Sequence, residues 1–331
     1  MPTRPARTPG HPFLLPDLTV PWPSRCNPHV DAVRRDTRSW ARRMGLLASP
    51  GTWTELSFDA DDWTLFAALT HPDATEARLR QVARWDVCLL ALDDYFVAAY
   101  KRTRDALGAR RFVDRLAAFM PPPGVAAPSP ENQVERALAD VWADTAPALP
   151  APVRARFPGE VLRFARGNLW ELANNLQHRV PDPVDYLEMR RETAGTELST
   201  GLGALSVGVH LPPEALASRE LRPMIETFAD VVGIRNDIHS YRKEIEEEQD
   251  VNNLLLTIRQ FFACDLQTAV DLAFGLYTAR LAQFERITEA LQARPEVRRF
   301  ACYLRDWLAG DNQWYRRTRR YVIGGRSGFS V

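Results

Sequence analysis

From Val30 onward the sequence reads as a succession of helical segments, which clusters of proline and glycine such as Pro121-Pro122-Pro123-Gly124 separate. Alternating strand patterns with hairpin turns are missing, and no repeat of fixed period occurs. We therefore predict an all-α fold in which about ten helices form a single domain around a central core or cavity. The predicted helices span residues 30–46, 59–69, 75–105, 108–118, 130–147, 151–178, 183–209, 219–247, 252–260, 265–291, 295–308 and 311–321.

The two ends of the sequence differ from this helical region. Residues 1–29 are rich in proline and do not support a regular helix, so we predict an extended N-terminal arm that packs over the domain. Residues 30–321 are predicted to form the α-helical domain. Residues 322–331 are predicted to be a C-terminal tail.

The composition argues against partners that are recruited by overall charge. Lys plus Arg and Asp plus Glu both total 42, so no net field draws the protein to nucleic acid or to an anionic membrane. We therefore expect no nucleic-acid partner and no membrane partner. Any anionic ligand must be held by a local cluster of groups.

The cysteines and the start of the sequence bear on the compartment. The four cysteines lie far apart and match no metal-binding spacing, so we predict reduced thiols that are mostly in the core. The N-terminal sequence has no apolar signal core, and no stretch of about 18 uninterrupted apolar residues occurs. A cytoplasmic protein is expected.

Three oxygen-bearing side chains in one predicted helix give the strongest chemical signal. Asn236, Ser240 and Glu244 are each four residues apart, a spacing that puts them in a row on one face of a helix. A hard cation such as Mg²⁺ takes a few protein oxygens of this kind and completes its octahedron with water and substrate phosphate. The alternative interpretation is the polar face of a surface helix.

A pair of aspartates gives the second signal. Asp93 and Asp94 interrupt an apolar run that begins at Val87 and resumes after them at Tyr95. Two carboxylates at the end of a buried helical stretch are costly unless a cation or hydrogen-bond donors receive them. Aspartate pairs are also common at helix ends, so the pair gains its meaning from the first motif.

Both motifs, and short segments along nearly the whole chain, resemble the class I terpene cyclases, in particular bacterial enzymes similar to the cyclase domain of germacradienol synthases. The segments that carry the resemblance are Pro12-Phe13, Val20-Pro21-Trp22-Pro23, Asn27-Pro28-His29, Thr70-His71-Pro72-Asp73, residues 100–105 and residues 169–174. The resemblance implies the class I terpenoid synthase helical barrel, with three Mg²⁺ ions at the mouth of a central active-site cavity. By this match Asp93 bridges metal ions with Asp94 beside it, and Asn236, Ser240 and Glu244 chelate the remaining ion.

The resemblance also assigns a clamp for a diphosphate group. Arg190, with Arg191 as the alternative, matches the family's diphosphate-sensing arginine, and Lys243 precedes the glutamate of the metal motif. Arg320 and Tyr321 match the family's Arg-Tyr pair. Arginine and phenol donors that point at phosphate oxygens stabilise charge as it builds on a leaving group.

The function implied is a Mg²⁺-dependent terpene cyclase that ionises an isoprenoid diphosphate and closes the carbocation into a cyclic hydrocarbon or alcohol. The segment Thr193-Ala194-Gly195 resembles the family's helix break beside the cation. The alternatives are a prenyl transferase, which shares the fold and the metals, and a non-catalytic isoprenoid-diphosphate-binding or helical scaffold protein. A homodimer is compatible with all three.

Four further expectations concern residues near these motifs. Position 98 is alanine where relatives usually carry an acidic residue, which weakens the aspartate motif. The acidic run 246–250 is predicted to be a solvated helix end, and His239 a neighbour of the metal site rather than a ligand. Trp170, Trp307 and Trp314 are assigned either to the core or to the cavity wall.

The last expectation concerns substrate length. Cys88, Ala91 and Leu92 share a helix face at i, i+3 and i+4, and they are predicted to project into the cavity beside Asp93. Because relatives tend to be aromatic in this segment, small residues would deepen the cavity. We therefore expect geranylgeranyl diphosphate to be accepted at least as readily as farnesyl diphosphate, which is the alternative substrate.

Overall fold

The computed structural model describes residues 12–48 and 51–321, and its regular structure there consists of helices with no β-strand. The predicted all-α fold is therefore confirmed. The α-helices are α1 Val30–Arg43, α2 Glu55–Asp61, α3 Trp63–Thr70, α4 Glu76–Phe96, α5 Ala106–Leu116, α6 Gln133–Thr145, α7 Ala151–Gln177, α8 Pro183–Thr193, α9 Thr196–Val207, α10 Pro213–Leu216, α11 Arg222–Tyr241, α12 Leu254–Phe262, α13 Leu266–Ala290 and α14 Pro295–Tyr315. Two of them continue as single π-helical segments, α4 into η1 Val97–Lys101 and α11 into η4 Arg242–Glu247.

Side-chain caps fix where the long helices begin. The hydroxyl of Thr75 accepts a hydrogen bond from the backbone N–H of Arg78 at the start of α4. Asn253 and Asp265 cap α12 and α13 in the same way, through the N–H groups of Leu255 and Thr268. Each cap satisfies one of the donors that the first turn of a helix leaves without a partner.

Two predicted helices are broken in the structure. The predicted helix 59–69 falls into α2 and α3, because Asp62 between them has a φ of +48° and its side chain caps the start of α3. Residues 183–209 form two helices, α8 and α9, because Gly195 between them has a φ of +67°, in the left-handed region that favours glycine. The break leaves Thr193, Ala194 and Gly195 on the wall of the cavity described below. This is the segment in which the sequence suggested a helix break.

Two predicted helices are joined in the structure. The prediction of separate helices at 295–308 and 311–321 is wrong, because α14 runs without interruption to Tyr315 and residues 316–321 are not helical. Gly310 serves close packing here, since a Cβ at this position would lie 2.2 Å from the backbone carbonyl oxygen of Leu69 on α3. Stacking of Trp314 on Trp63, with ring centroids 4.8 Å apart, fixes the same contact.

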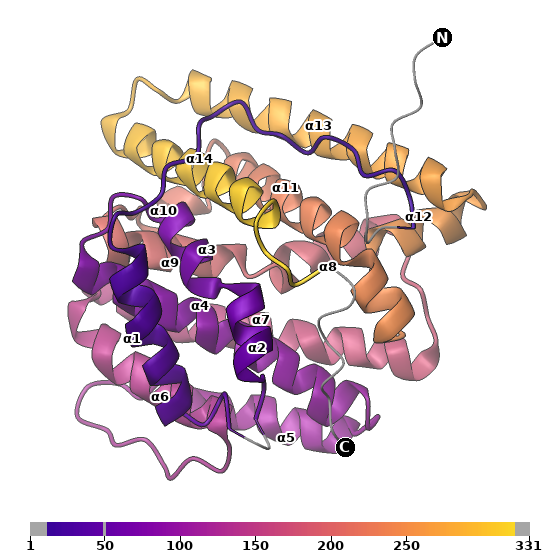
Figure 1. The fold of residues 1–331 in the computed structure, drawn as a ribbon. Coiled ribbons are helices and arrows are strands. Elements are labelled where there is room, and N and C mark those ends of the chain that lie inside the picture. Colours follow the sequence, from indigo (N-terminus) through magenta and orange to yellow (C-terminus); the bar gives the residue numbers. More distant parts are fainter. Residues whose placement is uncertain (1–11, 49–50, 322–331) are drawn as a thin grey trace.

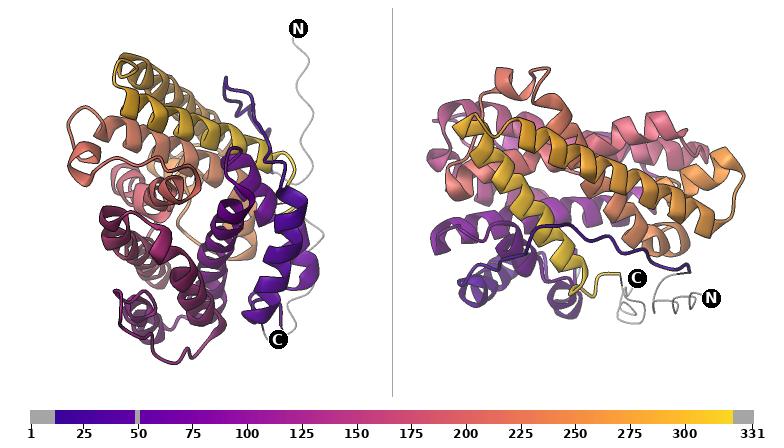
Figure 2. Two further views of the ribbon diagram at one scale, coloured as in Figure 1. Left: turned by 90° about the vertical axis from the view of Figure 1, so that its left-hand side faces the viewer. Right: turned by 90° about the horizontal axis from the view of Figure 1, so that it is seen from above.

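The helices enclose two apolar clusters. One joins α1 to α7 and α9 with Trp314 of α14, and the other joins α8 and α11 to α14 with the N-terminal arm. Figures 1 and 2 show α11, α13 and α14 on one side of the molecule and α1, α5 and α6 on the other. Phe66 of α3 packs against both clusters and marks the region where they meet.

The N-terminal arm was predicted for residues 1–29, of which residues 1–11 lie outside the described part of the chain. Residues 12–29 run without helix along α13 and α14 to the start of α1 (Figure 1). The backbone N–H of Leu14 donates to the side chain of Gln267 at 2.9 Å, and the hydroxyl of Tyr277 donates to the carbonyl of Leu18 at 2.9 Å. The predicted tail, residues 322–331, also lies outside the described residues.

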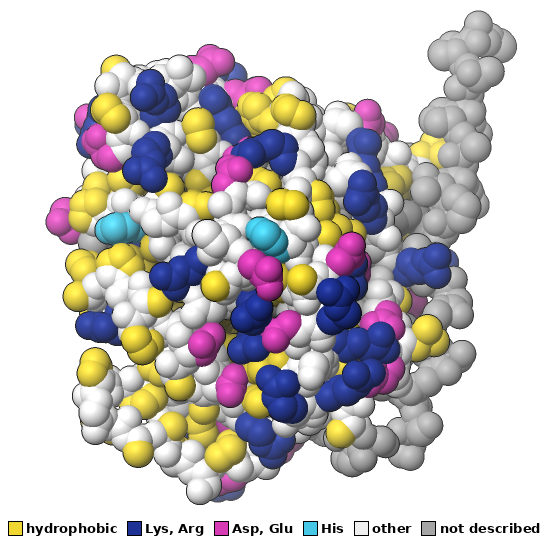
Figure 3. All heavy atoms as spheres, turned by 60° about the vertical axis from the view of Figure 1, so that its left-hand side comes forward, with side chains coloured by type: hydrophobic (Ala, Val, Ile, Leu, Met, Phe, Trp, Pro, Cys, Tyr) yellow, Lys and Arg dark blue, Asp and Glu magenta, His cyan; other side chains and the backbone are white. Residues whose placement is uncertain are grey.

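The surface carries charges of both signs. On the face drawn in Figure 3, Lys and Arg side chains are interspersed with Asp and Glu side chains. No helix in the ranges 12–48 and 51–321 has the length and apolar character needed to cross a membrane.

The expectation that the cysteines lie mostly in the core is wrong, since Cys88 alone is buried while Cys26 and Cys302 are exposed.

Gly310→Ala should destabilise the protein by about 1–3 kcal/mol, because the new methyl group meets a backbone oxygen that cannot move aside easily. Gly275→Ala is the matched control, since Gly275 lies in α13 and a Cβ there has no neighbour within 4 Å. At that site alanine should stabilise the helix by up to about 1 kcal/mol. Thermal unfolding followed by far-UV dichroism measures both changes, and equal effects of the two substitutions would contradict the packing assigned to Gly310.

Candidate active site

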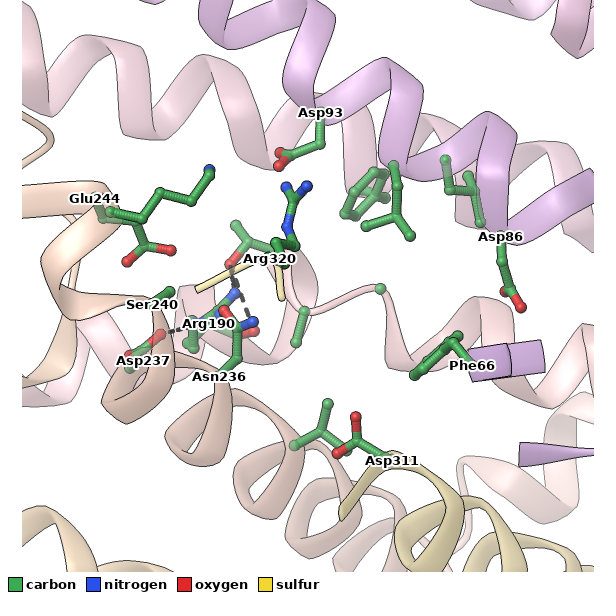
Figure 4. A pocket seen from close by; sticks show the side chains of 18 of the residues that line it. Phe66, Asp86, Asp93, Arg190, Asn236, Asp237, Ser240, Glu244, Asp311 and Arg320 are labelled. Atoms are coloured by element: carbon green, nitrogen blue, oxygen red, sulfur yellow. Dashed lines mark hydrogen bonds and ion pairs between the residues drawn. The ribbon is translucent and has the colours of Figure 1, made fainter. Parts of the chain in front are cut away.

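A cavity of about 210 Å³ lies where the two apolar clusters meet. Its wall combines an apolar part, with Phe66, Leu89, Leu198 and Trp307, and a polar end formed mainly by α8, α11, η4 and the residues after α14. Figure 4 shows Asp93 on α4 facing the helix that carries Asn236 and Ser240. Two motifs that are more than 140 positions apart in the sequence therefore border one space.

Asn236, Ser240 and Glu244 line the polar end of this cavity. The first two belong to α11, and Glu244 follows on the π-helical segment η4. Ser240 is 2% exposed, and its hydroxyl oxygen has no hydrogen-bond partner among the described residues. Burial, with the Asp237 carboxylate adding to it, raises the pKa of Glu244 to about 8.

The aspartate pair is divided between two environments. Asp93 lines the cavity, and burial raises its pKa although Lys101 opposes the shift. Asp94 is not among the lining residues, and its two oxygens accept hydrogen bonds from Arg320 at 2.7 and 3.0 Å. The indole N–H of Trp53 also donates to Asp94, at 2.6 Å. The structure thus brings Asp93 to the cavity and places Asp94 behind it, against Arg320.

Arg190 reaches the metal motif directly. Its Nε donates to Asp237 at 2.9 Å, and one terminal nitrogen donates to the side-chain oxygen of Asn236 at 2.6 Å (Figure 4). Burial opposes the charge of Arg190, but Asp237 outweighs it, so its pKa lies well above the ordinary value. Arg191, the alternative from the sequence, binds Asp230 instead and does not line the cavity.

The other predicted clamp residues also reach the cavity. Lys243, Arg320 and Tyr321 all line it. Lys243 forms an ion pair with Glu248 at 2.7 Å, and Arg320 binds the buried carboxylate of Asp61 at 2.8 Å in addition to Asp94. Every predicted site residue except Asp94 and Arg191 therefore lines the same cavity.

A second charged group on the wall was missed by sequence reasoning. The ammonium of Lys101 donates to Glu171 at 2.6 Å and to Asp250 at 2.8 Å, and all three residues line the cavity. The interpretation of residues 246–250 as a solvated helix end is thus wrong for Glu248 and Asp250, because Lys243 and Lys101 draw them inward. Lys101 and Glu171 lie within segments that carry the family resemblance, which was the available signal.

The cavity face of α4 differs from the predicted one. Asp86, Leu89, Leu90 and Asp93 line the cavity, whereas Cys88, Ala91 and Leu92 are buried in the first apolar cluster. The prediction that this second set faces the substrate is wrong, because the i, i+3, i+4, i+7 positions that accompany Asp93 begin at Asp86. Leu89 and Leu90 keep the cavity side of the segment aliphatic.

The remaining residues singled out from the sequence differ in whether they line the cavity. Trp307 and Trp314 line the cavity, whereas Trp170 only packs against the second apolar cluster. Ala98 is exposed and His239 is not a lining residue; its ring stacks on Tyr315 with centroids 4.3 Å apart. Position 98, where relatives usually carry an acidic residue, thus lies outside the cavity wall.

The polar end fits a hard cation that arrives with an anionic ligand. In the described part of the chain no three His, Cys, Asp or Glu side chains form a metal site by themselves. The row of Asn236, Ser240 and Glu244 supplies oxygen donors of the kind that Mg²⁺ accepts, and the partnerless oxygen of Ser240 is free to bind. The lining residues include eight carboxyl groups but four Lys and Arg side chains, so a diphosphate needs accompanying cations to enter.

Comparison with known proteins agrees with this geometry. The family model described as "Terpene synthase family 2, C-terminal metal binding" matches residues 84–283. Pristinol synthase of Streptomyces pristinaespiralis is 28% identical, with 93% of this chain and 87% of the relative covered. A 4-epi-cubebol synthase of Streptosporangium roseum, whose name specifies cyclisation of (2E,6E)-farnesyl diphosphate, is 26% identical over 96% of this chain and 94% of its own.

A solved structure of a cucumene synthase variant has the same fold. It superposes with a TM-score of 0.79 at 25% identity and covers 91% of this chain and 99% of its own. The matched family region contains the α4 aspartates, Arg190 and the Asn236–Glu244 row, all of which the preceding paragraphs locate at or beside one cavity. This chain therefore belongs to the terpene synthase family and is a class I terpene cyclase.

Proposed function

We propose that the enzyme binds a diphosphate group at the polar end of the cavity together with three Mg²⁺ ions, which Asp93 holds on one side and Asn236, Ser240 and Glu244 on the other. The observation that carries the proposal is that these oxygens lie on facing walls, and that the buried hydroxyl of Ser240 has no partner in the part of the chain that the structure describes. Bound Mg²⁺ supplies Lewis acidity to the leaving group.

The basic residues of the polar end stabilise the departing diphosphate. Arg190, Lys243 and Arg320 present charged donors to one volume, and Tyr321 adds a phenol. When the carbon–oxygen bond breaks, its electron pair goes to the diphosphate, and fixed donors around that group lower the energy of the developing charge. Asp94 acts in this proposal by orienting Arg320 rather than by binding metal.

The apolar part of the cavity receives the allylic cation. Phe66, Trp63 and Trp307 line it, and aromatic faces stabilise positive charge without forming a bond to it. The break at Gly195 places non-helical backbone on the same wall. Enclosure by these groups folds the chain for ring closure and keeps bulk water away from the cation.

The proposed substrate is farnesyl diphosphate. The name of the Streptosporangium roseum relative specifies this substrate, and so does that of a 7-epi-alpha-eudesmol synthase, 26% identical over 92% of this chain. The argument for a longer substrate depended on Cys88, Ala91 and Leu92, which lie outside the cavity wall. The aliphatic residues Leu89 and Leu90 leave geranylgeranyl diphosphate as the competing candidate.

A cytoplasmic location is also proposed. All four cysteines are free thiols, and two of them, Cys26 and Cys302, are exposed. Exposed free thiols are typical of proteins in a reducing compartment. The homodimer stays a prediction.

Chelation by EDTA should abolish diphosphate release from farnesyl diphosphate, and added Mg²⁺ should restore it. Asn236→Leu and Glu244→Gln should each lower turnover by on the order of a hundredfold, because they remove oxygens that act on the leaving group through the metal. Glu247→Gln is the matched control, since Glu247 is an exposed carboxylate on the same π-helical segment. Full activity after thorough chelation, or equal losses in both glutamate variants, would contradict the proposed site.

Arg190→Gln should lower turnover by on the order of a hundredfold or more, because the variant loses a charged donor that points into the cavity. Arg191→Gln, one position further, should stay within about threefold, since its contact with Asp230 lies outside the wall. Diphosphate release, with melting temperature as the check on folding, distinguishes the two arginines. A larger loss in the Arg191 variant would reverse the assignment.

Competition between equal concentrations of farnesyl and geranylgeranyl diphosphate should yield mainly C15 products. Gas chromatography of the extracted products measures the ratio directly. Leu90→Phe should increase the preference for the shorter chain, because the side chain at position 90 lines the cavity. Ala91→Phe lies outside the wall and should lower stability rather than change the ratio. A majority of C20 products from the native enzyme would overturn the proposed substrate.

A further inference from the structure

Asp86 is a buried carboxyl group in the cavity to which the proposed ionisation gives no role. It is 7% exposed and lines the cavity from α4, on the same face as Asp93. Among the described residues its side chain has no hydrogen bond or ion pair, and its Oδ2 is fully enclosed without a partner. Other buried carboxylates of the wall are paired: Asp237 with Arg190, Asp311 with Arg235, and Asp250 with Lys101.

The fold gives no reason for this residue. Burial of a polar group without a partner costs free energy, and an apolar side chain of similar size would avoid that cost. Asp86 contributes to the raised pKa of Tyr303, but the hydroxyl of Tyr303 already donates to the carbonyl of Ser199 at 2.6 Å and contacts His71 at 3.1 Å. Asp86 therefore faces the cavity with unused hydrogen-bonding capacity.

Its position separates it from the diphosphate site. Asp86 precedes Asp93 by seven residues, so the two lie about 10 Å apart along the helix axis. Figure 4 shows its carboxyl group directed toward the part of the cavity that Phe66 borders, away from Asn236 and Glu244. In the proposed binding mode this part of the cavity holds the hydrocarbon portion of the substrate.

Burial also favours the neutral form of the Asp86 carboxyl group. Within residues 12–48 and 51–321 no Lys or Arg side chain forms an ion pair with Asp86, and burial raises its pKa well above the ordinary value. A neutral carboxylic acid both donates and accepts hydrogen bonds. The partner that suits such a group in an enclosed cavity is a water molecule, since buried waters bind to polar groups that the protein leaves unsatisfied.

We propose that Asp86 holds one water molecule against the hydrocarbon end of the substrate, and that this water captures the final carbocation to give a terpene alcohol. The inference rests on the proposed function, which supplies the cation. The bond from carbon to diphosphate breaks with both electrons leaving on the diphosphate, and the water oxygen forms the new carbon–oxygen bond. One proton of the resulting oxonium ends on the released diphosphate, and Asp86 finishes as the acid that it was at the start.

The first test needs no substitution. The native enzyme is incubated with farnesyl diphosphate in water enriched in oxygen-18, and the products are analysed by gas chromatography with mass spectrometry. The main product should be an alcohol that carries the heavy isotope. A main product without oxygen, or with oxygen that does not come from water, overturns the inference. Absence of diphosphate release would instead contradict the proposed function.

The second test uses two substitutions that differ only in hydrogen bonding. Asp86→Leu removes the water-binding group, so the ratio of alcohol to hydrocarbon should fall by at least about tenfold. Asp86→Asn keeps a donor and an acceptor, so the ratio should stay within about threefold of the native value. Asp114→Leu, at an exposed aspartate of α5, is the matched control and should leave the ratio unchanged.

The ratio is independent of how much enzyme folds, because both products come from the same active molecules. An unchanged ratio in the Leu variant would show that the water is held elsewhere. If the Asn variant loses the alcohol as completely as the Leu variant, the acidity of the carboxyl group matters, and the water-holding role is wrong.

Discussion

The carboxylate of Asp237 holds the catalytic end of the cavity together. Arg190 and Tyr186 from α8 and the backbone N–H of Leu254 at the start of α12 all donate to it from within 3.0 Å. Three helices therefore converge on one buried charge, and removing Arg190 would leave that charge uncompensated. The ion pair with Asp237 also directs Arg190 toward the side-chain amide of Asn236. Asp237 therefore positions both the metal motif and the diphosphate clamp.

Other buried ion pairs also link separate elements, and they affect how the site binds its ligand. Lys101 connects α7 with the loop after η4, and Arg320 connects the chain after α14 with α2 and α4. These cations are held in place before any substrate arrives, so little side-chain freedom is lost on binding. Their carboxylate partners also keep the empty site from being strongly positive, which makes the accompanying metal ions part of recognition.

The sequence predicted the all-α class and most helices, because proline, glycine and capping residues act locally. It also predicted the row of Asn236, Ser240 and Glu244 along α11 and η4, since side chains four residues apart share one face of a helix. It failed where packing against another element decides the outcome. The helix α14 continues through Gly310 because α3 packs there. Asp250 lies inward because it accepts a hydrogen bond from Lys101. The face of α4 was misassigned by two positions, an error that periodicity alone cannot correct when both faces are buried.

The N-terminal arm has a consequence for synthesis on the ribosome. Leu14 and Leu18 bond to Gln267 and Tyr277, which lie 253 and 259 positions later in the chain. At about 5–20 residues per second, roughly 13 to 50 s separate the translation of each arm residue from that of its partner. The arm therefore cannot dock until α13 has been translated, and during that interval Phe13 and Leu18 lack the complete second apolar cluster that buries them in the finished protein. Closing contacts over so long a separation also slows folding, which makes this delay a period of exposure to aggregation.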